Sequence, residues 1–179
     1  MSLADWLDCS APVSIGEAQR AVLDELARML DHLQPALLDR SRSRLVAAKA
    51  EGSTEEDAAV VVFEHATDPD AAVEVVIAPS GAIIAWLGVH EHVDPDDAWE
   101  DRPWTVAVVD AVAGILRGEY QVEDMTRLGH WVRSRVIDVA DPNGPRTLTT
   151  SAPLWGWALH FFPAVVARRR VDYGVAETR

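Results

Sequence analysis

The chain has 179 residues, of which 49% are hydrophobic and 25% charged, the balance of a soluble globular protein with one well-buried core. This composition excludes a wholly disordered chain, a collagen-like fibre and a disulfide-stapled scaffold. The formal net charge is -13, from 16 basic and 29 acidic residues. Such a surface repels phosphate backbones and anionic lipid, so we expect neither a nucleic-acid partner nor a membrane.

The cysteine content and the apolar segments bear on the cellular compartment. Cys9 is the only cysteine, so no internal disulfide and no multi-cysteine metal site can form. The first residues lack the basic and apolar regions of a signal peptide. The most apolar stretch, 152–167, is interrupted by Gly156, His160 and Pro163 and falls short of the roughly 20 residues that cross a bilayer. We expect a cytoplasmic protein with one domain over 1–179, whose residues 1–12 form a flexible end.

The first predicted element is a helix that begins near Ser14 and ends at Pro35. Ser14 and Glu17 have the S-x-x-E spacing of a capping box. Apolar residues then recur every three or four positions, as on one face of a helix, at Ile15, Ala18, Val22, Leu26, Met29, Leu30 and Leu33. Residues 37–50 are ambiguous between a strand and a second helix, and we favour a strand over 44–50.

Three strands and a second helix follow. The strands are predicted at 60–63, 73–77 and 82–87, with turn signals at 67–70 and 79–81. An acidic segment, 91–101, precedes a helix that Pro103 opens and Gly118 ends.

A hairpin is predicted next, with strands at 120–127 and 130–139 joined by Leu128–Gly129. That turn places Arg127 opposite His130 and Asp124 opposite Arg133. A short strand at 147–150 and an edge strand at 168–173 complete the order. We therefore expect an α+β fold: an antiparallel sheet of about five to seven strands with two main helices packed mainly on one face.

Sequence motifs for catalysis are missing. No glycine pattern matches a dinucleotide or phosphate loop, and no G-x-S-x-G segment is present. Glu123 and Asp124 are adjacent on a predicted strand, so they project to opposite faces and cannot share a substrate. We interpret them as a solvated hairpin edge. More generally, we expect the carboxylates and ring nitrogens to be dispersed over solvent-facing turns.

One run of residues supplies metal-ligand side chains, although we favour an interpretation of it without a metal. On an extended chain His90, His92 and Asp94 project to the same side, and two imidazoles with a carboxylate are ligands for Zn²⁺ or another divalent metal. Glu64 and His65 would join them if their strands were neighbours. The competing interpretation is a strand that ends in an acidic, solvated loop, which needs no cofactor.

Aromatic residues near the C-terminus indicate a partner-binding surface. Tryptophan and phenylalanine are common in binding hot spots, and four of them gather at Trp155, Trp157, Phe161 and Phe162. The other interpretation, which we favour, is that this stretch covers an open face of the sheet and completes the core. The basic run 168–170 is too short for a nucleic-acid footprint, so pairing with the protein's own acidic residues or protection of an edge strand explains it.

These observations favour a small acidic binding module without enzymatic activity. We expect it to act by protein-protein contacts, as a homodimer or with another protein. The alternative is a metal-binding protein or metal-dependent enzyme that uses His90, His92 and Asp94. The sequence specifies neither the partner nor the oligomeric state.

Overall fold

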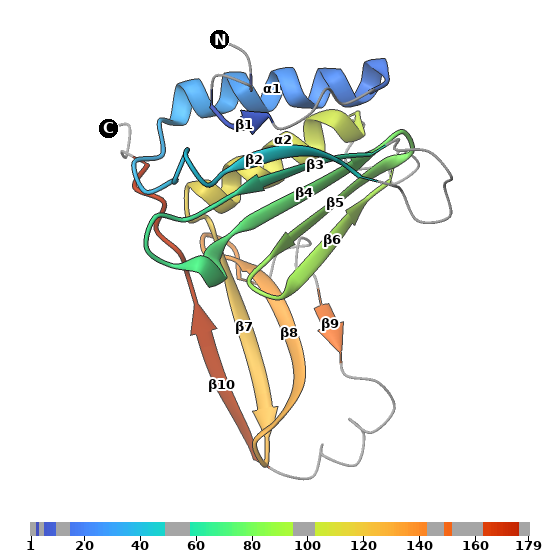
Figure 1. Ribbon diagram of the computed structural model, residues 1–179. Helices are drawn as coiled ribbons and strands as arrows, with labels where there is room; N and C mark the ends of the chain where they lie inside the picture. The colour runs from blue at the N-terminus through green and yellow to red at the C-terminus, as the bar shows by residue number, and fades with distance from the viewer. Residues whose placement is uncertain are drawn as a thin grey trace. The chain divides into compact units, whose positions relative to one another are not determined.

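The computed structural model describes residues 3, 6–9, 15–48, 58–94, 103–142, 149–151 and 163–175 (Figure 1). The α+β class predicted from the sequence is confirmed. Along the chain the elements are β1 (Asp8–Cys9), α1 (Glu17–Leu33), β2 (Arg44–Ala48), β3 (Ala58–Phe63), the short 3₁₀ helix η2 (Pro69–Ala71), β4 (Val73–Ala78), β5 (Gly81–Trp86), β6 (Val89–Val93), α2 (Trp104–Leu116), β7 (Tyr120–Arg127), β8 (His130–Asp138), β9 (Thr149–Ser151) and β10 (Ala164–Arg169).

The chain divides into two compact units, each with its own sheet. Unit 1 comprises residues 1–117 and 172–179, and unit 2 comprises residues 118–171. Within the described ranges, unit 1 contains sheet I, with strand order β1-β2-β3-β4-β5-β6, and unit 2 contains sheet II, with order β10-β7-β8-β9. The strands thus form two sheets rather than the one predicted, because the hairpin that follows α2 pairs with β9 and β10 and not with β6.

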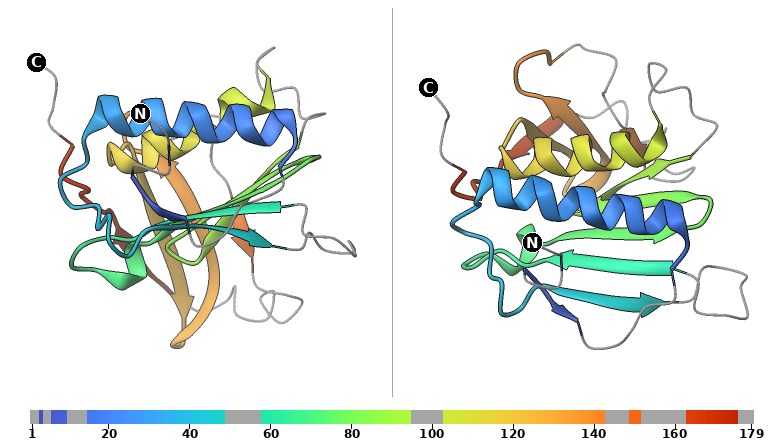
Figure 2. Two further views of the ribbon diagram at one scale, coloured as in Figure 1. Left: turned by 45° about the horizontal axis from the view of Figure 1, so that its top comes forward. Right: turned by 90° about the horizontal axis from the view of Figure 1, so that it is seen from above.

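Sheet I is antiparallel from β2 to β6, and β1 joins β2 in parallel. Helices α1 and α2 lie together on one face of this sheet, as predicted (Figure 2). The strand register aligns Val61, Val75 and Ile84 in one row, and each is at most 3% exposed. Strand residues alternate between faces, so the core of unit 1 lies between sheet I and the two helices.

Helix α1 begins later than the sequence motif predicts. Gly16 precedes the first helical residue, and its N–H donates to Oε1 of Gln19 at 2.7 Å. Ser14, the cap predicted from the sequence, lies outside the described residues; Glu17 is the first helical residue, and Gln19 rather than Glu17 makes the return bond. Gln19 also donates from Nε2 to the Ile77 carbonyl at 2.9 Å. One buried amide therefore both caps α1 and joins it to β4.

Two hairpins turn on the same pair of residue types. Leu128 and Gly129 have φ of 52° and 78°, and Leu87 and Gly88 have φ of 50° and 78°. Positive φ at both central residues is the type I′ geometry that matches the twist of paired strands. The first turn confirms the predicted hairpin. The second turn, which separates β5 from β6, was not predicted.

The register of the β7–β8 hairpin differs from the prediction by one residue. Arg127 pairs with His130 as predicted, but Asp124 pairs with Ser134 and Met125 pairs with Arg133. An irregularity between Met125 and Thr126 causes the shift, since a bulge sets two residues of one strand against one of the other.

Other strand boundaries agree with the sequence to different degrees. The strand favoured over 44–50 is confirmed for Arg44–Ala48, and residues 49–50 lie outside the described ranges. The edge strand predicted over 168–173 lies instead at Ala164–Arg169. Its first half is apolar, and residues 172–175 leave it to join unit 1.

Tyr173 anchors this returning segment in unit 1. Its ring is 1% exposed, and its hydroxyl accepts from Trp86 Nε1 at 3.0 Å and donates to the Ala71 carbonyl. Burial raises the pKa of the Tyr173 hydroxyl, which keeps it a donor. The Tyr173 carbonyl also accepts from the N–H of Leu37 at 2.9 Å. The C-terminal segment is therefore part of the fold of unit 1.

The N-terminal residues also contribute to unit 1. Trp6 is 1% exposed and donates from Nε1 to Asp31 at 2.7 Å, while the Arg40 guanidinium lies 3.5 Å from the centre of its ring. The flexibility of residues 1–12 and the single domain over 1–179 stay predictions. In the described part of the chain, neither helix has the length and hydropathy to span a bilayer.

We predict that Tyr173→Phe lowers the free energy of unfolding by about 1–3 kcal/mol, because the indole N–H of Trp86 and the carbonyl of Ala71 would lose a buried partner. Urea unfolding followed by circular dichroism measures this change. Unchanged stability would show that water replaces the hydroxyl without cost.

Candidate interaction surface

Strand β10 forms one edge of sheet II. It pairs with β7 over its whole length, from Ala164 opposite Arg127 to Arg169 opposite Val122. Among the described residues no strand pairs with its other edge. All six of its residues are exposed, and Val165 and Val166, on opposite faces of the sheet, are 67% and 45% exposed. The edge strand of a sheet is a template on which another extended chain can pair.

Glu123 holds β10 to the sheet from one face. It is 4% exposed and accepts from Arg135 Nε at 2.8 Å and from Arg168 Nε at 3.0 Å. Burial by itself raises the pKa of the Glu123 carboxyl, but the hydrogen bonds from these two guanidinium groups outweigh it and lower the pKa below its ordinary value. The interpretation of Glu123 as a solvated hairpin residue is therefore wrong.

Asp124 holds β10 from the other face. Its Oδ2 accepts from Arg169 Nε at 2.9 Å, and its Oδ1 accepts from the Ser134 hydroxyl. That hydroxyl in turn accepts from Trp131 Nε1 at 2.8 Å. The pairing predicted between the basic run and the protein's own carboxylates is confirmed for Arg168 and Arg169. Glu123 and Asp124 face opposite sides of the sheet, as alternation along a strand requires.

An apolar cluster lies where β7, β8 and β10 meet near the Leu128 turn. Thr126 pairs with both Trp131 and Val165, so these three side chains form one row on one face. Trp131 is 42% exposed and Leu128 is 61% exposed. Tryptophan and β-branched side chains that share a row and contact solvent are the groups that gain most from burial by a partner.

The charge of unit 2 differs in sign from that of the rest of the chain. Residues 118–171 contain seven arginines and five acidic residues, whereas the remaining residues contain nine basic and twenty-four acidic side chains. Unit 2 is thus slightly positive, and unit 1 carries the acidity of the protein. The β10 edge belongs to the part of the chain that does not repel acidic partners.

The predicted metal ligands lie on β6. His90 and His92 are exposed on the same face, with ring centres 5.4 Å apart, and Asp94 follows the strand. Among the described side chains, no group of three or more His, Cys, Asp or Glu residues is arranged to hold a metal ion. The suggestion that Glu64 and His65 join this group is wrong, because β4 and β5 separate β3 from β6. The metal site at His90, His92 and Asp94 stays a prediction.

The predicted aromatic surface falls outside the described residues. Trp155, Trp157, Phe161 and Phe162 all lie within 152–162, so their role in partner binding stays a prediction. Sequence reasoning missed Trp131, Val165 and Val166. A signal for the two valines exists, since Ala164–Ala167 is an uncharged stretch between Pro163 and the arginines.

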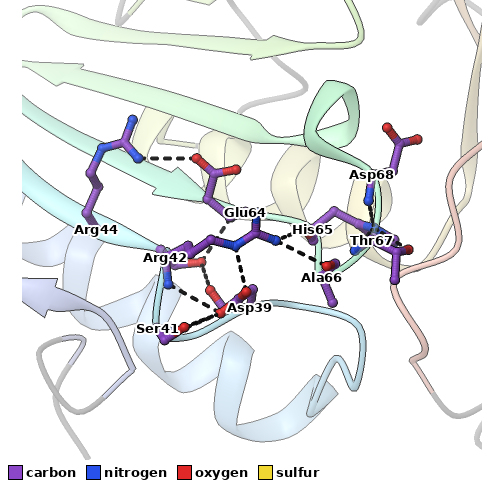
Figure 3. A network of polar contacts seen from close by, with 10 residues as sticks. Asp39, Ser41, Arg42, Arg44, Glu64, His65, Ala66, Thr67 and Asp68 are labelled. Carbon is purple, nitrogen blue, oxygen red and sulfur yellow. Dashed lines mark hydrogen bonds and ion pairs between the residues drawn. The ribbon is translucent and has the colours of Figure 1, made fainter.

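The densest polar network in the described chain lies around Asp39 (Figure 3). Hydrogen bonds from Ser41 and Arg42 lower the pKa of the Asp39 carboxyl to about 2. Arg42 also donates from Nη2 to the His65 carbonyl at 2.7 Å, and the Ser43 hydroxyl donates to the Asp39 carbonyl at 2.7 Å. These groups satisfy one another and join the segment before β2 to the end of β3, which is a structural role.

His65, at the edge of this network, is buried rather than solvent-facing. Its ring is 5% exposed. Nδ1 accepts from the N–H of Asp68 at 3.1 Å, and Nε2 lies 2.9 Å from the Asp172 carbonyl. The proton therefore belongs on Nε2, which donates to Asp172. The sequence pattern led us to expect carboxylates and ring nitrogens on solvent-facing turns. The buried Glu123 and His65 contradict this expectation.

Comparison with known proteins adds no family. No protein-family model, no curated protein sequence and no solved structure matches the chain.

We predict that Glu123→Gln lowers the free energy of unfolding by about 1.5–3 kcal/mol at neutral pH, because two charge-assisted hydrogen bonds lose their acceptor charge. A lowered pKa means that the stabilisation is complete above the ordinary pKa of glutamate and is lost as pH falls through the lowered value. The difference between the two proteins should therefore shrink in acid. Denaturant unfolding over a pH series tests this, with the exposed Asp141→Asn as control. A difference independent of pH would contradict the role of the charge.

Proposed function

We propose that this protein is a binding module without enzymatic activity that acts in the cytoplasm through protein contacts. The contact surface is the outer edge of β10 with the exposed apolar side chains near it: Val165, Trp131 and Leu128, and Val166 on the opposite face of the sheet. The observation that carries this proposal is the exposure of all six residues of β10, a strand with no described strand on its outer side. A chain with one cysteine needs no oxidising compartment to fold, which supports the cytoplasmic location.

Addition of a strand to an open sheet edge is an established way for proteins to bind extended segments. Main-chain hydrogen bonds provide affinity, and alternate side chains provide specificity. On β10, Val165 faces the side of Trp131, and Val166 pairs with Met125 on the opposite side. A bound strand would contact apolar side chains on both faces of sheet II.

Edge strands are commonly protected by charged side chains that repel a second strand. The charged residues of β10 are Arg168 and Arg169, and each is bound by a carboxylate of β7. Ala164–Ala167 carries no charge. The edge therefore lacks the usual protection over its first four residues, which supports a role in binding.

A photoreactive phenylalanine at position 165 tests the proposal in cells of the native source. We expect a cross-linked product whose partner peptide is identified by mass spectrometry, because Val165, at 67%, is the more exposed of the two valines of β10. The matched control places the same group at Val106, a 40% exposed valine of α2. Cross-linking at position 165 no greater than at position 106 would contradict the proposal.

The second candidate function is metal binding by the histidine pair of β6. Its support is the proximity of two exposed imidazoles, with ring centres 5.4 Å apart, since imidazole nitrogens are preferred ligands of Zn²⁺, Cu²⁺ and Ni²⁺. Asp94 would supply a third ligand by movement of the segment after β6.

Titration calorimetry with Zn²⁺ tests this candidate. We expect one binding event that His92→Ala abolishes, because a single imidazole retains little affinity, and that His130→Ala on β8 leaves unchanged. Zn²⁺ binding that persists in His92→Ala, or no binding by the unaltered chain, would exclude a site at this pair.

A further inference from the structure

We propose that the strand bound by β10 is β10 of a second copy, paired antiparallel about a two-fold axis at Val166. This inference rests on the proposed function and names its partner. The two copies would join their sheets II into one continuous sheet. Three observations lead to it: the edge of β10 on which no described strand pairs, the direction of its charged side chains and its residue order.

The open edge supplies the backbone groups for such pairing. Strand β10 pairs with β7 on one side, and in the described chain it is the end strand of sheet II. An isologous dimer needs the same patch on both partners. An antiparallel pair of identical strands meets this condition, because each strand offers the other the same donors and acceptors.

The arginines of β10 are directed inward. Arg168 Nε lies 3.0 Å from Glu123, and Arg169 Nη2 lies 2.8 Å from Asp124. Both carboxylates belong to β7, on the side away from the open edge. Their ion pairs reduce the repulsion that two approaching arginine-bearing strands would otherwise meet.

The residue order of β10 favours antiparallel pairing over parallel pairing. With the axis at Val166, that residue faces its own copy, Val165 faces Ala167 of the other strand, and Ala164 faces Arg168. Apolar residues then pair with apolar residues or with the aliphatic part of an arginine. A parallel pair in register would instead set Arg168 against Arg168, which is destabilising.

The salt dependence of binding distinguishes self-association from binding of a basic protein. Each chain carries -13, so two copies repel at long range, but the acidic excess lies in unit 1 while residues 118–171 are slightly positive. Salt screens the long-range repulsion. Self-association through β10 should therefore strengthen as salt is added, whereas binding of a basic protein to the acidic residues would weaken.

Sedimentation equilibrium of the full chain over a micromolar to millimolar concentration series tests the proposal. We expect a monomer–dimer equilibrium that tightens from low to high salt. Val166→Lys and Val166→Glu should each weaken it at least about tenfold, since each sets like charges directly opposite one another. An equimolar mixture of the two variants should recover dimers of mixed composition, because the axis then places lysine against glutamate. Val106→Lys is the control for surface charge.

Thermal unfolding of each variant verifies that the fold is kept, and circular dichroism at low concentration excludes simple misfolding. A monomer at every concentration, or dimers that Val166→Lys leaves intact, would overturn the proposal. Failure of the mixture to recover dimers would overturn the axis at Val166. If the chain is monomeric while position 165 still cross-links to a different protein, the proposed binding function stands and self-association does not.

Discussion

Glu123 and Asp124, neighbours on β7, attach β10 to sheet II from opposite faces. Each carboxylate binds an arginine of β10, and Glu123 also binds Arg135 of β8. Hydrogen bonds to charged groups contribute about 1.5–3 kcal/mol when their partners are shielded from water, as Glu123 is. The pairs therefore determine both that β10 is a strand of this sheet and that its charges are directed toward β7.

This arrangement separates two tasks between the two units. In unit 1 several polar groups hold elements of the fold together: Gln19 joins α1 to β4, Asp39 joins the segment before β2 to the end of β3, and Tyr173 fixes the C-terminal segment. In unit 2 the sheet is small, its edge strand is exposed on both faces, and valine and tryptophan contact solvent. Because Trp131 and Val165 share a row with Thr126, their exposure supports the proposed contact surface.

Local sequence signals were sufficient for much of the fold. The spacing of apolar residues located both helices, and Pro35 and Gly118 marked their ends correctly. Leu128–Gly129 predicted a hairpin because glycine adopts positive φ without strain. The identical pair Leu87–Gly88 did not lead to a predicted turn, because it directly follows an apolar stretch and no other turn-forming residue lies beside the glycine. The same reading of Leu–Gly would have separated β5 from β6.

What the sequence did not reveal depends on contacts between distant residues. Arg168 and Glu123 are 45 positions apart in the sequence, and His65 and Asp172 are 107 positions apart. No local sequence pattern therefore indicates that the Glu123 carboxylate or the His65 ring is buried. The bulge at Met125 shifted a register that turn geometry alone had set. For the candidate interaction surface, the sequence predicted that the basic run 168–170 pairs with the protein's own carboxylates. The exposed valines of β10 went unnoticed because the strand was expected four residues later.

Hydrogen–deuterium exchange of residues 164–169, followed by mass spectrometry at low and high protein concentration, tests most directly whether the β10 edge is a binding surface for a second chain. Amides on an unpaired edge exchange fast, and amides in a strand ladder exchange slowly. We predict that exchange within 164–169 slows as concentration rises, while exchange in α2 stays constant. Equal exchange in 164–169 at both concentrations would contradict pairing at this edge.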